Sequence, residues 1–469
     1  MKAELREIIT VKRSLADCFR YVKDFSTIEQ WDPGVYRSQK LTPGQVEVGT
    51  QFELVLNVAG RRVPMQYTLE QCEHNAVLVL QGSNKTLAAL DTISFRDVGD
   101  GQTEIEYHAV LTLSAVPGAA RPLMMPSLKR LGKKAVAGLH TALSIPESAP
   151  SRSLKSSMKD RLVLPAALDF TERGYLNMPD KGLSQFMDGK TVLLTGPTGG
   201  LGLAAACELS RLGAKLLLVG RGMTRLQAAK QAVLDFSGAA EDSIELYEAE
   251  LSVMAEVRRA ASAIASKHQR LDVLINNAGV LPLSREETAE GNELTLAVNL
   301  LAPVLLMREL APLLAEAGGR VINVASGGMY LAALKLDDMQ FREGKFDGSR
   351  AYARAKRALV AVTEDMAEQW QGDGVSFNAM HPGWAATPGV AKSLPGFNKR
   401  LGKYLRDERM GADTMVWLAS AEDAAGQTGK FWFDRQEHTT AVVPGTAVSP
   451  EQKARLLQEI HHLLDQHSG

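Results

Sequence analysis

A glycine-rich turn lies between an apolar run and a helical pattern at residues 195–202. The turn reads TGPTGGLG, follows KTVLLT and opens into LAAACELSRLG. Such a strand–turn–helix offers a pyrophosphate unpaired backbone N–H groups and the positive end of a helix dipole. Gly196 then makes the tight turn, Gly200 allows close approach, and Gly202 packs the helix. Glycines that merely end a buried strand remain the alternative, because a glycine pattern alone is a weak signal.

Apolar runs alternate with helical patterns over residues 189–469. The runs are KTVLLT, AKLLLVG, IELYEAE, DVLINNA, RVINVAS, VSFNAM and KFWFD. This alternation predicts an α/β domain with a doubly wound parallel sheet. Its last helix begins after Ser449, with Pro450 at the first position and Gln452 completing a capping box.

The first part of the chain has a different texture. Short alternating runs separated by turn residues predict an antiparallel α+β domain over 1–145. A helix candidate at 14–25 precedes the longer runs, and a second at 119–143 follows them. Residues 146–188, rich in Pro, Ser and Lys at their start, form the expected linker and lead-in.

Length and composition agree with two domains. The 469 residues exceed what one core usually supports, and a net charge of -1 argues against a nucleic-acid partner. The three cysteines are too few and too widely spaced for a disulfide framework or a cysteine metal site, and we expect no metal. With no signal-peptide pattern and no membrane-spanning run, we expect a cytoplasmic protein.

Three residues suggest carbonyl or alcohol chemistry. Tyr352 and Lys356 are four apart, so on a helix they share one face. A nearby ammonium is expected to lower the pKa of the phenol and make it a usable general acid or base. Ser326 ends a strand, where its hydroxyl could hold a substrate oxygen. A solvated helix face and a strand-end cap are the alternatives for residues taken singly.

Cofactor choice is encoded after the second strand of this domain, in KLLLVGRGMTRL. No Asp or Glu occurs between Lys215 and Gln227, and Arg221 stands at the turn. A carboxylate here would favour NAD, whereas a cation favours the 2′-phosphate of NADP. NADP is therefore expected, with Arg225 as a second contact; a surface arginine in a loop is the alternative.

The ordered motifs TGxxxGxG, NNAG, VN, VAS, YARAK and PG resemble those of the short-chain dehydrogenase/reductase family, over about Gly189 to Arg435. The resemblance implies a Rossmann-type fold, a homo-oligomer, a small-molecule substrate and Asn299 as a fourth catalytic residue. It also implies that Lys356 binds the nicotinamide ribose. Two departures are a glycine loop without a basic residue and Glu250 in place of an aspartate. The implied cofactor contacts are Thr195, Gly196, Thr198, Gly199, Gly200, Leu201, Gly202, Arg221, Glu250, Leu251, Asn277, Ala278, Gly279, Tyr352, Lys356, Pro382, Gly383 and Thr387.

The first domain resembles the START-like polyketide cyclase and lipid-transport (SRPBCC) superfamily. WDPGV at 31–35 and the order of elements carry this resemblance, which implies a helix-grip fold around an apolar ligand cavity. The helix candidate 119–143 and its flanks contain Arg121, Lys129, Arg130, Lys133 and Lys134 but no acid. A pocket-closing helix with a solvated face is favoured over a peripheral contact with anionic lipid.

Together these observations predict an NADP-dependent oxidoreductase acting on a carbonyl or secondary alcohol of a hydrophobic substrate, which the first domain binds or presents. The segment 384–411 is expected to cover that substrate with Trp384, Leu394, Phe397 and Leu401. Two alternatives stay open. The chain could be a hydrophobic-ligand carrier or redox sensor, or the first domain could cyclise the product of the second.

Overall fold

The structure is a computed structural model that describes residues 2–58, 61–113, 121–144, 168–178, 181–183, 185–370, 372–387, 396, 399 and 401–466. The chain divides into two compact units. The first comprises Met1–Glu147 with Pro179–Phe186 and Asp235–Gly238, and the second comprises the remaining residues. Two short segments from beyond residue 145 are thus grouped with the first unit.

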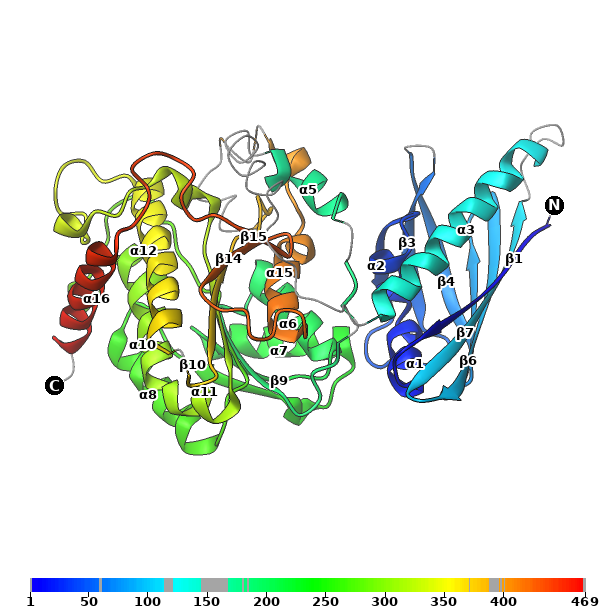
Figure 1. The fold of residues 1–469 in the computed structure, drawn as a ribbon, viewed down its shortest axis with the longest axis horizontal. Helices are drawn as coiled ribbons and strands as arrows, with labels where there is room; N and C mark the ends of the chain where they lie inside the picture. The colour runs from blue at the N-terminus through cyan, green and yellow to red at the C-terminus, as the bar shows by residue number, and fades with distance from the viewer. Residues whose placement is uncertain are drawn as a thin grey trace. The chain divides into compact units, whose positions relative to one another are not determined.

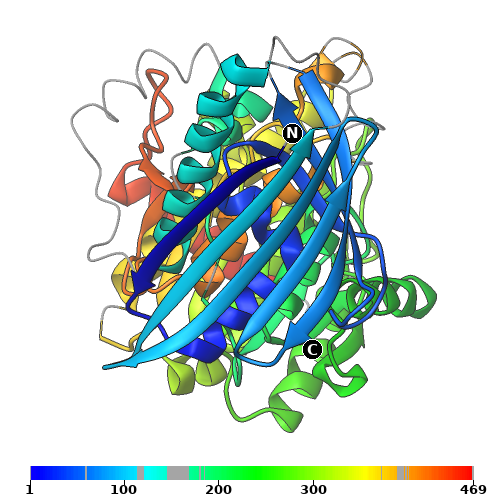
Figure 2. The same ribbon diagram turned by 90° about the vertical axis from the view of Figure 1, so that its right-hand side faces the viewer.

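The first unit is a seven-stranded antiparallel sheet covered by helices. Its strands are β1 (Lys2–Val11), β2 (Val35–Lys40), β3 (Gln51–Val58), β4 (Arg61–Glu73), β5 (Val77–Ser83), β6 (Leu87–Gly99) and β7 (Gln102–Leu113). They lie in the order β1-β7-β6-β5-β4-β3-β2 (Figure 2). Its helices are α1 (Leu15–Lys23), a 3-10 turn (Phe25–Thr27), α2 (Ile28–Trp31) and α3 (Arg121–Leu143).

Alternation within these strands explains the layers. In β6 every second residue from Ala89 to Phe95 is buried, so one face of the sheet packs against the helices. α3 crosses the sheet and contacts β1 and α2 (Figure 1). The helix-grip architecture that the resemblance implied is confirmed.

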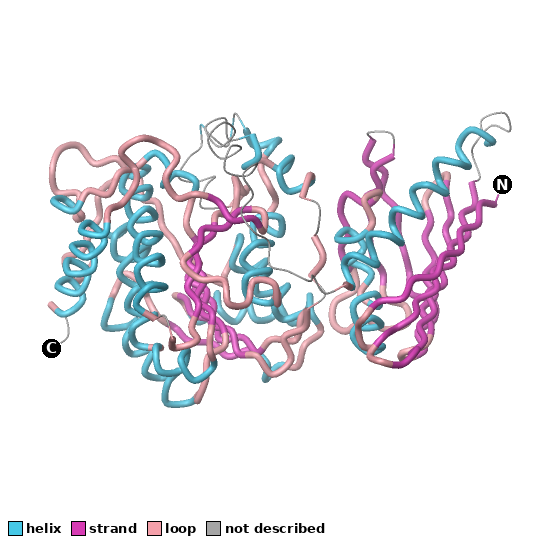
Figure 3. Tube along the Cα trace, viewed as in Figure 1, coloured by secondary structure: helices cyan, strands magenta, loops and turns pink. Residues whose placement is uncertain are grey.

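The second unit is built on an eight-stranded, mostly parallel sheet in the order β10-β9-β8-β11-β12-β13-β14-β15. Helices lie on both sides of its strands (Figure 3). The strands are β8 (Thr191–Thr195), β9 (Lys215–Gly220), β10 (Ile244–Glu248), β11 (Val273–Asn276), β12 (Arg320–Val324), β13 (Ser376–Met380), β14 (Lys430–Phe433) and β15 (Gln436–His438). The helices are α5 (Glu172–Leu176), α6 (Gly200–Arg211), α7 (Met223–Ser237), α8 (Met254–Lys267), α9 (Leu294–Leu296), α10 (Ala302–Glu309), α11 (Ala311–Ala317), α12 (Gly348–Gln369), α15 (Glu408–Ser420) and α16 (Pro450–Asp465).

The predicted doubly wound parallel sheet is confirmed, and its strand order positions the site. From β8 the chain adds β9 and β10 on one side of the sheet and then returns to add β11 on the other side of β8. The carboxyl ends of β8 and β11 therefore flank the point at which the strand order reverses. The sequence pattern missed β15, whose three residues pair antiparallel with β14. The capping box of α16 is present as expected.

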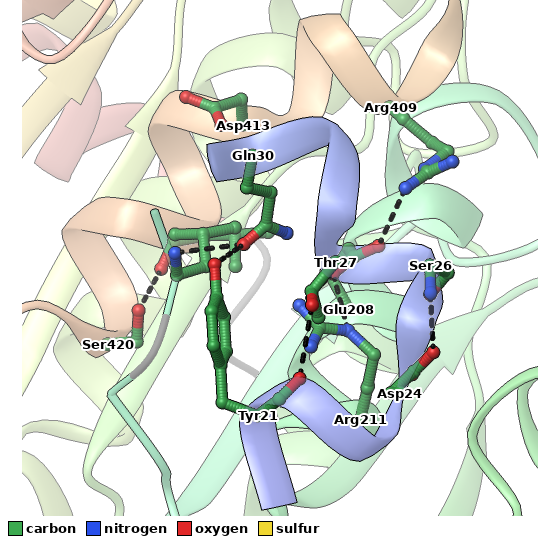
Figure 4. A network of polar contacts seen from close by, with 12 residues as sticks. Tyr21, Asp24, Ser26, Thr27, Gln30, Glu208, Arg211, Arg409, Asp413 and Ser420 are labelled. Carbon is green, nitrogen blue, oxygen red and sulfur yellow. Dashed lines mark hydrogen bonds and ion pairs between the residues drawn. The ribbon is translucent and has the colours of Figure 1, made fainter. Parts of the chain in front are cut away.

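Charged side chains are buried in α6 only where they are paired. Burial alone would raise the pKa of Glu208, but the guanidinium groups of Arg211 and Arg409 hold it below its usual value (Figure 4). Within the first unit, Figure 4 also shows the Tyr21 hydroxyl donating to Gln30 over 2.8 Å. These pairs fix helices that carry no reactive group.

Several expectations fall outside the described residues. They concern most of the linker, Leu394 and Phe397 of the covering segment, and the side chains of Arg121 and Lys129. In the part of the chain that is described, no single helix is long and apolar enough to cross a bilayer. The pair Leu294–Glu309 and Ala311–Ala317 passes that test only jointly, with a 61° bend between its members.

Candidate active site

The glycine turn has the geometry that the sequence predicted. Gly196 and Gly200 have φ angles of 69° and 55°, a region in which side chains are rarely tolerated. A Cβ at Gly202 would overlap the carbonyl oxygen of Gly196 and lie 2.6 Å from the amide nitrogen of Asn277. Thr198 and Gly199 are exposed, and a Cβ at Gly199 would meet nothing within 4 Å. The turn is therefore tight on its inner side and open on its outer side.

Thr195 joins this turn to the end of β11. Its hydroxyl accepts hydrogen bonds from the backbone N–H groups of Asn277 and Ala278, both at 3.0 Å. The Asn277 side chain donates in return to the carbonyl oxygens of Thr195 and Gly196, at 2.9 and 3.2 Å. Thr195 and Asn277 hence hold the two strand ends together at the point of reversal.

Tyr352, Lys356 and Ser326 converge at the same edge of the sheet. Tyr352 and Lys356 lie on α12, which begins after Asp347, whose side chain accepts from the Arg350 N–H. Ser326 follows β12 and hydrogen-bonds the phenol of Tyr352. Lys356 is 2% exposed, and its ammonium donates to the carbonyl oxygen of Val324 at 2.7 Å and lies 5.7 Å from the centre of the Tyr352 ring.

The expectation that Lys356 lowers the pKa of Tyr352 is wrong for this geometry. Burial raises the pKa of Tyr352 to about 12, although the hydrogen bond with Ser326 works in the opposite direction. Burial also lowers the pKa of Lys356 to about 7. The Lys356 ammonium donates to a backbone carbonyl and not to the phenol. Desolvation, which spacing on a helix does not show, therefore dominates both groups.

Asn299 lies beside Lys356 in a π-helical turn, Ala297–Leu301. Its side-chain amide accepts from the N–H of Val280 at 3.0 Å and donates to the carbonyl of Val280 at 2.9 Å. A Cβ at Gly279 would lie 2.8 Å from the Asn299 oxygen and 3.7 Å from the Lys356 nitrogen. Both amide atoms of Asn299 are thus bonded to Val280, the residue that follows NNAG.

Glu248, which the sequence pattern did not single out, lies beside the end of β9. Arg221 is exposed after β9, and its guanidinium lies 3.2 Å from Glu250. The carboxylate of Glu248 accepts from the N–H groups of Gly222 and Met223, both at 3.0 Å. Arg225 donates to the carbonyl of Arg221. The carboxylates of Glu248, the last residue of β10, and of Glu250 thus lie beside the end of β9. The stretch between Lys215 and Gln227 itself contains no acid.

The remaining expected cofactor contacts lie partly in the hydrophobic core and partly at the surface. Leu251 is buried in the main hydrophobic core, and Leu201 packs toward Gly411 of α15. Gly383, at φ 75°, lies directly against the guanidinium of Arg406. Pro382 precedes it, and the Thr387 N–H donates to the carbonyl of Ala385. Trp384 is partly exposed.

The residues present fit a nicotinamide dinucleotide. A pyrophosphate would meet the exposed outer side of the turn at Thr198 and Gly199, where added atoms encounter free space. Lys356, Tyr352 and Ser326 lie at the carboxyl end of β12, the strand next to β11, where the reacting end would be held. In the described residues, no group of three or more His, Cys, Asp or Glu side chains is arranged to hold a metal ion.

Comparison with known proteins agrees with this geometry. The family model for short chain dehydrogenases matches residues 190–396, and that for polyketide cyclase/dehydrase and lipid transport matches residues 2–144. The chain is 37% identical over 303 residues to dehydrogenase/reductase SDR family member 12 of Bos taurus, covering 63% of this chain and 94% of the relative. It is 33% identical over 275 residues to retinol dehydrogenase 14 of Mus musculus, covering 55% of this chain and 80% of the relative.

Among solved structures, levodione reductase matches at a TM-score of 0.44 and 28% identity, covering 52% of this chain and 95% of that one. The family-model match over residues 190–396 includes the glycine turn, Ser326, Tyr352 and Lys356. The chain is a dehydrogenase/reductase. With these residues and this parallel sheet, the chain belongs to the short-chain dehydrogenase/reductase family.

Proposed function

We propose that the second unit uses NADP(H) to interconvert a carbonyl group and a secondary alcohol on a hydrophobic substrate. The observation that carries the proposal is the convergence of Ser326, Tyr352 and buried Lys356 beside the glycine turn. When bound, the nicotinamide supplies or accepts the hydride. The residues of this chain then have to hold the substrate oxygen and move one proton.

The pKa values favour the direction of reduction. A phenol with a pKa of about 12 is protonated at neutral pH, which is the form that can donate a proton to a carbonyl oxygen. Ser326 can hold the same oxygen, because its hydroxyl already hydrogen-bonds the phenol. Oxidation of an alcohol requires the phenolate instead, which burial disfavours here.

The preference for NADP(H) rests on Arg221. It is an exposed cation at the end of β9, where a 2′-phosphate would lie, and Arg225 is exposed close by in the first turn of α7. A hydrophobic substrate is supported by the partly exposed Trp384 beside the site and by relatives named for retinol, an apolar alcohol. The match of the first unit to a family named for lipid transport supports a role in binding or presenting that substrate.

Nicotinamide absorbance tests the proposal directly. Purified full chain is mixed with NADPH or NADH and a panel of apolar aldehydes and ketones, and oxidation of the cofactor is followed. We expect turnover with at least one carbonyl, faster with NADPH, and its loss in Tyr352→Phe. Tyr247→Phe, which removes a hydroxyl on β10 bonded to Glu245, is the control and should retain activity. A Tyr352→Phe protein with unchanged turnover would contradict the assigned chemistry.

A further inference from the structure

Arg406 is a buried arginine that the reaction chemistry does not use. Its side chain is 1% exposed, and it makes a two-pronged ion pair with Asp434 at 2.5 and 2.8 Å. The same guanidinium donates to the backbone carbonyls of Asp169, Phe170 and Thr171 at 2.7, 3.2 and 3.1 Å. It therefore fastens a lead-in segment far earlier in the chain to the turn between β14 and β15.

The fastened segment also binds the loop that follows β13. The Trp384 N–H donates to the carbonyl of Phe170 at 2.7 Å, and the Arg406 N–H donates to the carbonyl of Trp384 at 2.8 Å. The guanidinium occupies the space beside Gly383 that a side chain would need. Arg406 thus contacts both the lead-in segment and the Pro382–Gly383–Trp384 loop at the candidate site.

Phe170 continues this set of contacts to the catalytic serine. Its ring meets His381 edge-on, with the ring centres 4.5 Å apart, and meets Trp384 at 5.6 Å. His381 is buried against Phe433, and its Nδ1 accepts from the N–H of Gly327 at 3.1 Å. Gly327 follows Ser326 directly, so the backbone of the catalytic serine turn rests on the same aromatic cluster.

The electrostatics keep His381 in the form that this contact needs. Burial, with the nearby Arg406 guanidinium and the His438 side chain, lowers the pKa of His381 well below its usual value. A neutral imidazole can accept at Nδ1, whereas an imidazolium cannot. Without the guanidinium of Arg406, the backbone of Phe170 would lose a hydrogen bond. The Phe170 ring would then no longer be held against His381.

We propose that Arg406 is a positioning residue, which acts through Phe170 and His381 to fix the Ser326–Gly327 turn and Trp384 around the substrate. Lysine at this position keeps the charge but cannot form the two-pronged pair and reach three carbonyls together. The lead-in segment around Phe170 then helps to position the catalytic residues and is not only a connection to the second unit.

Hydrogen exchange tests the coupling without any substrate. In Arg406→Lys, we expect faster exchange in peptides covering 168–178 and also in those covering 327–331. Asp434→Asn preserves the shape of the acceptor and suits its left-handed φ of 49°, so it provides a milder break if Arg406→Lys folds poorly. Arg320→Lys is the matched control, because Arg320 also donates to three backbone carbonyls but lies at the first residue of β12, at the opposite end of that strand from Ser326.

Faster exchange at 168–178 with no change at 327–331 would overturn the proposal, as would equal effects in Arg320→Lys. Kinetics add a second readout, which rests on the proposed function. We expect the KM for a reducible carbonyl to rise on the order of tenfold in Arg406→Lys, since misplacement by about 1 Å can cost up to a hundredfold. The Kd for NADPH should change less than this KM, although Arg406 lies against Gly383, an expected cofactor contact. Absence of turnover in the wild-type chain would contradict the proposed function and leave the exchange result as the test of positioning.

Discussion

The guanidinium of Arg221 lies 3.2 Å from the carboxylate of Glu250, so the cation expected to bind a 2′-phosphate already has an acidic partner. Glu250 stands where the family has an aspartate, and its other oxygen accepts from the N–H of Ser252. Binding a phosphate at Arg221 therefore competes with an existing ion pair. Cofactor affinity should reflect that competition.

Glu250→Gln should tighten NADPH binding. The pair is exposed, with 63% and 32% of the two side chains accessible, so we expect a gain of about two- to fivefold, as is usual for surface ion pairs. NADH, which lacks the phosphate, should change less. Fluorescence titration of both cofactors measures the effect, and Glu241→Gln, an exposed acid 3.8 Å from Lys230, is the control. Equal shifts for NADPH and NADH would show that Glu250 does not compete for Arg221.

Asp91 should make the stability of the first unit depend on pH. Burial raises its pKa to about 7, although hydrogen bonds from Tyr67 and Tyr107 lower it and the charge of Asp32 raises it further. The folded state then holds a proton that the unfolded state, with a pKa of 3.8, has released. This contribution is fully present below pH 4 and is lost as pH rises to about 7.

Asp91→Asn should remove this pH dependence. Asparagine stays neutral at every pH, so the denaturation midpoint of the first unit should vary less between pH 5 and 8 than in the wild type. Protection of β6 amides against hydrogen exchange follows the first unit specifically. Asp97→Asn, an exposed change on the same strand, should leave the wild-type profile intact. A wild-type midpoint that rises from pH 5 to 8 would refute the raised pKa.

Lys356 should make the stability of the second unit rise with pH, whereas Asp91 makes that of the first unit fall. Its pKa in the folded state is about 7, below the ordinary 10.5, so the unfolded state binds more protons between these values. Stability from this group therefore rises with pH across that window. Lys356→Met should stabilise the second unit most at pH 6 and progressively less toward pH 10, as measured by urea midpoints. A gain that is constant with pH would show that Lys356 is not desolvated.

The strands and the main motifs could be predicted because they depend on short stretches of chain. Apolar runs identify β8 to β14, and helical spacing places Tyr352 and Lys356 on one face of a helix, whereas the ordered motifs around them single the pair out. Glu248 and Arg406 could not be predicted, because each reaches the site from a separate segment that folding brings near. The pKa of Tyr352 is raised and not lowered for a related reason, because the burial of a side chain depends on the whole fold.

Gly202 and Gly199 of the glycine turn should respond differently to substitution by alanine. In Gly202→Ala the new Cβ overlaps the carbonyl oxygen of Gly196, so α6 must move away from the turn. Overpacking of this kind costs about 1–3 kcal/mol, and we expect NADPH affinity to fall by roughly ten- to a hundredfold as the turn N–H groups shift.

In Gly199→Ala the new Cβ meets nothing within 4 Å, and the residue is extended at φ 170°. The variant should therefore fold as the wild type does and keep the turn N–H groups in place, which makes it the matched control for the folding effect of Gly202→Ala. Titration of cofactor fluorescence compares Gly202→Ala with the wild type. If Gly202→Ala bound NADPH as tightly as the wild type does, the inner side of the turn would not be the element that holds the pyrophosphate donors in position.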